Sequence, residues 1–389
     1  MKFIFEKDDL IRAVTPAMGS VSSKSTIPAI EGILFTAKSD TECEIAAYDL
    51  EKAFKTSIPC EITLDDENRK SFVLNANKIN QIIKTMPSGS ITIEINDRLV
   101  SRIYSGKSEF ELHAFDGKDF PDIPELALNV GFSISQPILA KMIRDTQFAI
   151  AANDPRAALN GLYFTIKGTC ITIVSCDTFR LAIRKQICEV GNLSSDGNEL
   201  ELAFIIPGKT ITELMRLIDA KDEESTVKIV VGRKHVLFAF DDFNFLSRLI
   251  EGEYIDYERV IPKENRTFVN IDRESFIQSL ERAALVTEDR VMGQAKSPVI
   301  LTFEDNLAII TTKSVTGRVY DEVVTEMTGD PLKIGFNCRY ILDALRSTDV
   351  DNIKLSMSSP LMSMVIEATV VEDENEKFLY MVTPVKVKE

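Results

Sequence analysis

One pattern, a helix followed by a strand, occurs three times along this chain of 389 residues. Each copy predicts a short amphipathic helix that ends on a basic residue, then a turn, then an alternating strand. The copies cover 77–95, 208–231 and 337–357, and their basic helix ends are Lys84, Arg216 and Arg346, about 130 positions apart. A repeat of this length predicts three similar domains.

A further helix pattern precedes each copy. Apolar residues at three- and four-residue spacing predict helices whose buried faces carry Leu10, Leu139 and Phe276. Segments containing proline, at 120–124 and 260–263, predict the joints between the thirds. The expected domains are 1–126, 127–262 and 263–389.

The net charge of −15 argues against a simple nucleic-acid binder, but the charge is unevenly distributed. The six predicted helices carry twelve basic and eight acidic residues, so they form the positive part of an acidic molecule. For any single helix, a solvated face is the better interpretation. The same bias on all six helices weakens that interpretation.

Few residues in the sequence suit catalysis. Its two histidines, His113 and His235, lie in predicted strands without Cys or Asp at metal-ligand spacing. The sequence Gly-Lys-Thr at 208–210 resembles the end of a phosphate-binding loop, but Ala203 stands where that loop needs its first glycine. We therefore expect a protein that is not an enzyme and that uses no cofactor or metal.

The six cysteines are scattered without a CxxC pair, which predicts reduced thiols. The N-terminus, MKFIFEKDDL, becomes charged within six residues, so we expect no signal peptide. Uninterrupted apolar runs fall well short of the roughly 20 residues that span a bilayer. These features predict a cytoplasmic protein without a membrane partner.

Several short segments follow one another in a specific order along the whole chain. They include Tyr48-Asp49-Leu50-Glu51, Asp119-Phe120-Pro121, Leu159-Asn160-Gly161, Arg180-Leu181-Ala182, Asp256-Tyr257 and Gly335-Phe336-Asn337. In this order and spacing they resemble the bacterial DNA polymerase III beta subunit family, the sliding clamps. The resemblance implies an α+β fold of three DNA-clamp domains, each with two helices and two antiparallel sheets, that closes head to tail as a homodimeric ring.

Such a ring implies weak, sequence-independent contacts between helices and the phosphates of double-stranded DNA. The expected DNA-binding residues are Lys24, Lys84, Asn153, Arg156, Lys209, Arg216 and Arg346. The resemblance also implies a subunit joint, formed by Lys78, Lys107, Phe110 and Leu112 against Leu285, Val286, Asp321 and Glu322. An ordinary place in a strand core accounts for Phe110 and Leu112 nearly as well.

The resemblance further implies a peptide cleft between the second and third domains. In the family this cleft takes short linear motifs from the replicative polymerase catalytic subunit, the clamp loader, other polymerases and repair proteins. The matching positions are Leu159, Cys176, Thr178, Phe179, Arg180, Leu181, Ile255, Arg259, Val260, Asn337, Tyr340, Ser363, Met381, Val382, Thr383, Pro384 and Val385. The chain departs from the family pattern at Thr178, Phe179 and Ile255, which leaves its motif preference open.

The strand from Tyr380 to Val385 has a simpler alternative role, which is to complete a sheet. Because alternate residues of a strand face opposite ways, one strand can serve both roles. The whole chain can also be an acidic repeat scaffold that binds peptides but never DNA. An enzyme with an unrecognised site is disfavoured by the missing nucleophile, metal cluster and cofactor loop.

Overall fold

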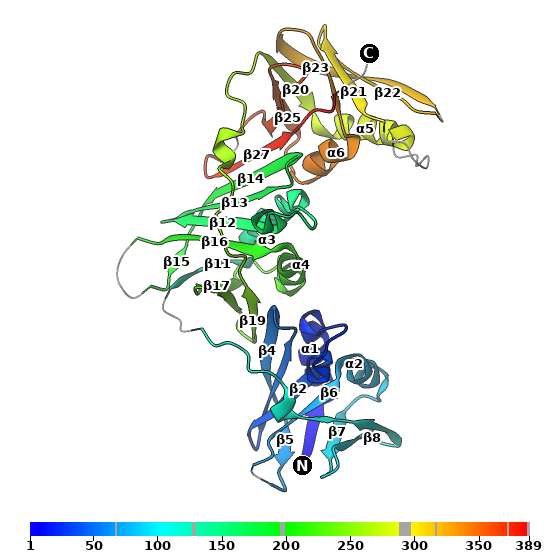
Figure 1. Cartoon of the computed structure of the whole chain (residues 1–389), viewed down its shortest axis with the longest axis vertical. Coiled ribbons are helices and arrows are strands. Elements are labelled where there is room, and N and C mark those ends of the chain that lie inside the picture. The colour runs from blue at the N-terminus through cyan, green and yellow to red at the C-terminus, as the bar shows by residue number, and fades with distance from the viewer. Residues whose placement is uncertain are drawn as a thin grey trace. The chain divides into compact units, whose positions relative to one another are not determined.

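The computed structural model describes residues 1–66, 68–126, 130–194, 199–287, 297–315, 317–371 and 373–386 (Figure 1). Its contacts group the chain into two compact units. Unit 1 comprises residues 1–136, 191–198 and 212–249, and unit 2 comprises residues 137–190, 199–211 and 250–389. Each unit holds one long antiparallel sheet, and unit 1 holds a second, smaller one.

Six α-helices form within the described residues, two in each third of the sequence, as predicted. They are α1 (Lys7–Ala17), α2 (Ala76–Thr85), α3 (Gln136–Arg144), α4 (Gly208–Leu217), α5 (Arg273–Thr287) and α6 (Cys338–Arg346). The Asn75 and Asn337 side chains cap α2 and α6, because each accepts a hydrogen bond from a backbone amide of the first turn (3.1 Å). The basic residues Lys84, Arg216 and Arg346 lie in the last turns of α2, α4 and α6.

Each helix buries one apolar stripe at the predicted spacing. The buried pairs are Leu10 and Val14, Ile79 and Ile83, Leu139 and Ile143, Ile211 and Leu214, Phe276 and Leu280, and Ile341 and Leu345. Burying one such side chain contributes about 1.5–3 kcal/mol, so packing rather than intrinsic helix propensity holds these short helices. Within the described residues, no helix is long and apolar enough to cross a membrane.

The smaller sheet of unit 1 has five strands. In spatial order they are β5 (Glu61–Thr63), β1 (Lys2–Glu6), β7 (Ser90–Ile95), β8 (Val100–Ser105) and β9 (Ser108–His113). The larger sheet of unit 1 has ten strands. They are β10 (Phe115–Asp116), β6 (Ser71–Asn75), β2 (Gly32–Ser39), β3 (Glu42–Tyr48), β4 (Lys52–Pro59), β19 (Phe243–Arg248), β18 (His235–Ala239), β17 (Thr226–Val231), β11 (Gly131–Ser135) and β15 (Gly191–Asn192).

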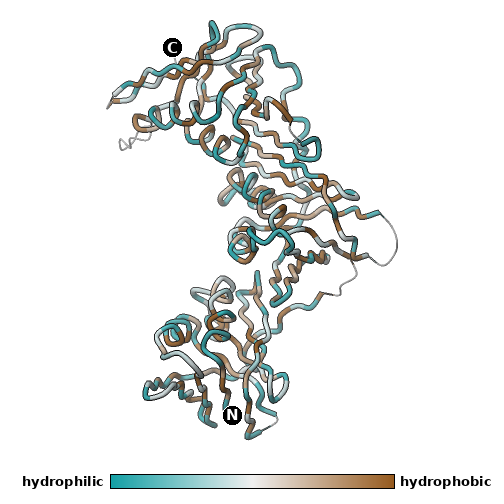
Figure 2. Tube along the Cα trace, turned by 180° about the vertical axis from the view of Figure 1, so that it is seen from behind, coloured by the Kyte–Doolittle hydropathy of each residue, from teal (hydrophilic) through white to brown (hydrophobic). Residues whose placement is uncertain are grey.

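The sheet of unit 2 has twelve strands. They are β16 (Glu201–Pro207), β12 (Gly161–Lys167), β13 (Cys170–Cys176), β14 (Arg180–Ile187), β27 (Glu376–Val382), β26 (Met364–Ala368), β25 (Asn352–Met357), β20 (Thr267–Asp272), β23 (Arg318–Gly329), β22 (Leu307–Lys313), β21 (Val299–Glu304) and β24 (Leu332–Phe336). Figure 2 shows hydrophobic and hydrophilic residues mixed along the strands of both units, as expected for sheets that face a core on one side.

The order of elements confirms the threefold repeat. Each third contains a three-stranded meander, then a strand, a helix and another strand: β2-β3-β4-β6-α2-β7, β12-β13-β14-β16-α4-β17 and β21-β22-β23-β24-α6-β25, apart from short insertions. The long sheets also run on from one third into the next. They do so where β4 pairs with β19, here called the first seam, and where β14 pairs with β27, here called the second seam.

Candidate functional site

The predicted cleft residues gather around the second seam, within unit 2. The strand register places Leu181 of β14 opposite Met381 of β27, and Arg180 opposite Val382. The C-terminal strand therefore completes the sheet of unit 2. Its neighbour across the seam is the strand that carries Arg180 and Leu181, so completing the sheet and bordering the predicted site are compatible roles.

The segment that follows β27 is fixed to its surroundings by backbone hydrogen bonds. The amide of Thr383 donates to the carbonyl of Phe179 (2.8 Å), and the amide of Val385 donates to the carbonyl of Gly335 (2.7 Å). Pro384 lies between them and is half-buried. These bonds hold 383–385 against two further segments, the turn before β14, which carries predicted cleft residues, and the end of β24, which leads into Asn337 and α6.

The centre of the second seam is a packed apolar cluster. Leu159, Cys176, Leu181 and Met381 are buried together, and Ile255 packs against them. Leu159 and Leu181 have no exposed surface, and Met381 has 5%. Four of the predicted cleft residues thus form a closed floor, whose burial stabilises unit 2 independently of any ligand.

Two tyrosines that the sequence analysis did not single out complete this floor. The rings of Tyr163 and Tyr254 stack with their centroids 4.8 Å apart, and Tyr257 packs against the same cluster. Burial raises the pKa of the Tyr254 hydroxyl and of the Cys176 thiol, so both groups stay neutral at physiological pH. Tyr163 and Tyr254 lie far apart in the sequence, so no local pattern marks them as partners.

A tight turn before β14 positions the exposed part of the site. The Oδ1 atom of Asp177 accepts hydrogen bonds from the amides of Phe179 (3.0 Å) and Arg180 (2.9 Å). Thr178, which lies between Asp177 and Phe179, has a positive φ of 74°, a conformation that non-glycine residues rarely adopt. The turn leaves the Phe179 ring 55% exposed, stacked on Tyr340 at a centroid distance of 5.9 Å.

Arg180 links this turn to α6. Its guanidinium pairs with Asp177 (Nε–Oδ2 3.0 Å) and with Asp343 of α6 (Nη1–Oδ2 2.5 Å). It also lies 4.6 Å from the ring centroid of Tyr340 and 5.5 Å from that of Phe148. Because these contacts hold the guanidinium between the turn and α6, Arg180 acts first as a positioning residue for Phe179 and Tyr340.

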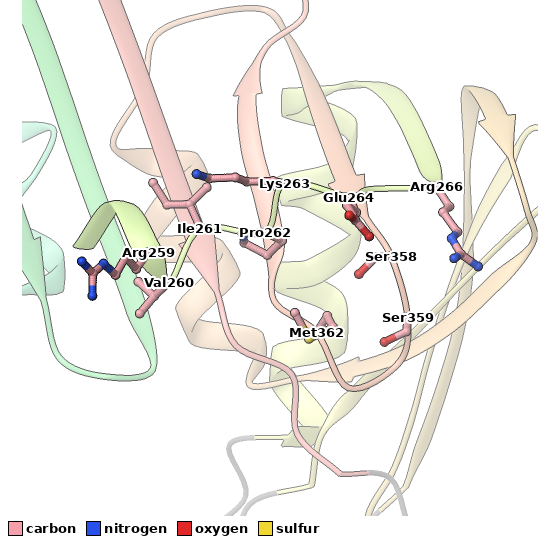
Figure 3. A pocket seen from close by; sticks show the side chains of 10 residues that line it. All are labelled: Arg259, Val260, Ile261, Pro262, Lys263, Glu264, Arg266, Ser358, Ser359 and Met362. Carbon is pink, nitrogen blue, oxygen red and sulfur yellow. The ribbon is translucent and has the colours of Figure 1, made fainter. Parts of the chain in front are cut away.

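The remaining predicted cleft residues form a more exposed rim. Arg259 ends the short 3-10 helix Tyr257–Arg259, is 86% exposed and pairs with Asp256 (2.7 Å). Val260 is 50% exposed, and Ser363 is half-buried just before β26. Arg259 and Val260 also line a pocket of about 730 Å³ along the linker 259–266 (Figure 3).

The predicted DNA-binding residues lie at exposed positions but differ in their pairing. Lys24, Lys84 and Lys209 are exposed, and Asn153 is exposed in a turn with φ 60°. The three arginines are all held in ion pairs: Arg156 with Asp154 (2.9 Å), Arg216 with Glu213 (3.0 Å) and Arg346 with Glu281. These pairs lower the positive charge that the arginines present, which the count of basic residues did not reveal.

The predicted joint residues lie partly at sheet edges. Phe110 in β9 is 41% exposed, so a place in the strand core is wrong for it, whereas Leu112 packs against the core of unit 1. In unit 2, Leu285 is 76% exposed and Val286 is half-buried near the end of α5. Lys78, Lys107 and Glu322 are exposed, and Asp321 is held by Ser279 (2.9 Å) and Arg282 (2.6 Å).

Comparison with known proteins covers the same three thirds. Three family models match this chain: the N-terminal, central and C-terminal domains of the DNA polymerase III beta subunit, over residues 1–124, 133–256 and 258–385. The Beta sliding clamp of Halalkalibacterium halodurans is 30% identical over 395 residues, which cover 99% of this chain and all of the relative.

Solved structures agree in fold over the full length. The crystal structure of the DNA polymerase sliding clamp from Bacillus subtilis has a TM-score of 0.89 and 29% identity, covering 100% of both chains. A putative DNA polymerase III beta subunit from Eubacterium rectale gives a TM-score of 0.89 at 28% identity, again over 100% of both chains. This chain therefore belongs to the beta sliding clamp family, the family of the bacterial DNA polymerase III beta subunit.

Proposed function

We propose that this chain is a sliding clamp: two copies join head to tail into a ring around duplex DNA and keep the replicative polymerase on its template. The observation that carries this proposal is the similarity to sliding clamps along the entire chain, together with the threefold repeat of elements. Retention by encirclement is topological, so the protein itself performs no catalysis. The same similarity gives no support to a peptide-binding scaffold that never meets DNA.

Two incomplete sheet edges support the ring. Among the described strands, β9 pairs on one side only, with β8. Within the described residues, 318–324 of β23 pair with β22 alone, whereas 325–329 pair with β20. Exposed apolar side chains accompany both edges: Phe110 on β9, and Tyr320 (64%) and Val324 (77%) on β23. Open edges with apolar side chains favour strand pairing between subunits, and a head-to-tail contact closes into a ring when its rotation closes.

The native mass tests the joint. The dimer has about twice the 43.5 kDa of one chain. Phe110→Asp is expected to shift the protein towards the monomer in light scattering, because it places a charge in the apolar contact. Phe115→Asp is the matched control, since Phe115 is also exposed (38%) but lies outside the proposed joint. A wild-type protein that stays monomeric at micromolar concentration would contradict the ring.

Contact with DNA is proposed first for the three exposed lysines of the predicted set, which form no ion pair within the part of the chain that the structure describes. Lys24, Lys84 and Lys209 are exposed, whereas Arg156, Arg216 and Arg346 already neutralise acidic neighbours. Replacing the three lysines by Glu is expected to weaken DNA binding uniformly across sequences and to flatten its salt dependence, since each phosphate contact adds about 0.9 to the slope. Replacing the three arginines by Gln is expected to have the smaller effect.

Around the second seam we propose docking of short motifs from polymerases, the clamp loader and repair proteins in the cytoplasm. The exposed Phe179, Val260 and Arg259 beside a packed floor support this surface. Leu181→Asp is a poor test of docking, because Leu181 is fully buried and the variant is expected to unfold. The exposed Phe179 is the better target, because its side chain can be shortened without opening the floor.

A further inference from the structure

The linker that follows the proposed docking surface borders a pocket of its own. Its volume is about 730 Å³, and it is lined by residues 259–264, Arg266, Ser358, Ser359 and Met362. Figure 3 shows the linker side chains in a row along one wall, with Arg259 and Arg266 at opposite ends and Glu264 between them. Ser358 lies close to Glu264 in the same view. We call this the linker pocket.

Both walls of the linker pocket are fixed by hydrogen bonds within unit 2. The amide of Arg266 donates to the carbonyl of Met357 (2.8 Å), which ties the linker to the end of β25. The opposite wall is a turn in which the amide of Met362 donates to the carbonyl of Ser359 (3.2 Å). The pocket is therefore formed before any ligand arrives.

The charge of the linker pocket is opposite to that of the chain. Three of its lining residues are cations (Arg259, Lys263 and Arg266) and one, Glu264, is an acid, although acids outnumber bases 60 to 45 in the sequence. Arg259 pairs with Asp256. Across the described ranges, no ion pair within 4.0 Å joins Lys263 or Arg266 to an acid, and both side chains are exposed.

Apolar surface accompanies these cations. Val260 is 50% exposed, Met362 47%, and the adjoining Leu361 72%. Apolar side chains of this size, exposed next to unpaired cations, match a peptide that alternates acidic and apolar residues better than they match a phosphate backbone. Val260 and Arg259 belong both to this pocket and to the rim of the second seam, so one extended peptide can reach both.

We propose that the linker pocket binds an acidic flank of the same partner segments that anchor at the second seam. Lys263 and Arg266 would contact Asp or Glu side chains of the partner, while Val260 and Met362 would cover an apolar neighbour. This inference rests on the proposed docking function. It adds that the partner segment carries negative charge next to the apolar residues that anchor it at the second seam.

Three synthetic peptides test the pocket by fluorescence anisotropy. The first carries a Leu-Phe anchor flanked by three Glu, the second the same anchor flanked by three Gln, and the third the Glu flank with both anchor residues changed to Ala. Each flank is placed on either side of the anchor in turn. We expect one Glu-flanked peptide to bind roughly threefold to tenfold tighter than its Gln counterpart at low salt, with the difference lost in 0.5 M salt.

A double variant assigns the effect to the pocket. In Lys263→Glu with Arg266→Glu the preference for the Glu flank is expected to vanish, while affinity for the Gln-flanked peptide stays unchanged. The control is Lys313→Glu with Lys333→Glu, which changes the net charge equally at two exposed lysines elsewhere. The control is expected to keep the preference, and thermal melting verifies that both variants fold.

Three results would overturn the inference. Equal affinities for Glu and Gln flanks, with the anchorless peptide not binding, leave the docking function standing without an acidic subsite. No binding of any anchored peptide removes the docking function and this inference together. A duplex DNA probe that loses affinity in the Lys263 and Arg266 variant, while flank preference is absent, assigns the pocket to DNA.

Discussion

At the first seam Ala53 lies opposite Leu246, and at the second seam Leu181 lies opposite Met381. The turns that lead into the two seams share their backbone. Leu50 has φ 73° and Thr178 has φ 74°, and each follows an aspartate whose side chain caps the turn. Asp49 accepts from the amide of Lys52 at 2.7 Å, much as Asp177 accepts from that of Arg180 at 2.9 Å.

The side chains placed on this shared backbone differ. Tyr48 and Ala53 of the first seam stand where Cys176 and Leu181 stand in the second. Glu51 occupies the exposed position that Phe179 has in the second seam. The linker residues Ile123 and Leu126 pack at the first seam and border a smaller cavity of about 230 Å³. One backbone thus carries an exposed acid at one seam and an exposed aromatic ring at the other, which favours peptide docking at the second seam.

The largest loss of stability is expected from a substitution in the floor of the second seam. Leu181→Ala removes a fully buried side chain and leaves a cavity, so the free energy of unfolding is expected to fall by about 2–5 kcal/mol. Chemical denaturation of the full chain measures it. A loss below about 1 kcal/mol would mean that the floor is not a closely packed cluster.

A second test compares the basic residues of the two turns. Arg180 pairs with two carboxylates and contacts two rings, whereas Lys52 pairs with Asp49 (3.1 Å). Arg180→Ala is expected to cost about 1.5–3 kcal/mol of stability and Lys52→Ala about 0.2–1 kcal/mol. Equal costs, measured in the same denaturant series, would contradict the role of Arg180 as the link to α6.

Substitution of the exposed residue of each turn, Phe179 or Glu51, is expected to have a smaller effect, confined to peptide affinity. Phe179→Ala is expected to weaken binding of an anchored peptide by about 0.5–1.5 kcal/mol without changing stability, because its ring is 55% exposed and stacks only on Tyr340 among the aromatic contacts of the described residues. Glu51→Ala, the matched change at the first seam, is expected to leave peptide affinity unchanged. Calorimetric titration with the anchored peptide measures both variants. An equal loss of peptide affinity in Phe179→Ala and Glu51→Ala would contradict docking at the second seam.

The smallest effect concerns the thiol of the second seam. Burial raises the pKa of Cys176, so less thiolate forms at a given pH than in an unfolded chain. Alkylation of Cys176 by iodoacetamide at pH 8 is expected to be slower in the folded protein than in urea. The half-buried Cys170 serves as an internal reference in the same mass-spectrometric digest. Equal rates for the two thiols in the folded protein would show that the floor opens freely.

Much of the fold could be predicted from local pattern. The six helices follow from apolar residues at helical spacing, and the meanders follow from alternation ended by turns. What pattern could not supply was pairing between distant segments, such as β14 with β27, nearly 200 residues apart in the sequence. Register between strands depends on which faces are buried together, and one sequence alone does not state it.

The residues of the candidate site also fall into those that could be predicted from the sequence and those that depend on distant partners. Leu159, Leu181 and Met381 were placed by resemblance, and the structure brings them into one cluster. Tyr163 and Asp343 were missed because each acts through a partner far along the chain, Tyr254 and Arg180. The pairing of Arg346 with Glu281 was missed for the same reason, since a count of charges on one helix does not show the neighbour that neutralises it.

Retention on closed DNA is the measurement that most directly tests encirclement. The protein is loaded by a clamp loader onto a nicked circular plasmid, separated from free protein by gel filtration, and the plasmid is then cut once. A ring is expected to stay with the circular plasmid and to leave after linearisation, because only a free end lets it slide off. Equal retention on circular and linear DNA would contradict the proposal that this chain works by encircling the duplex.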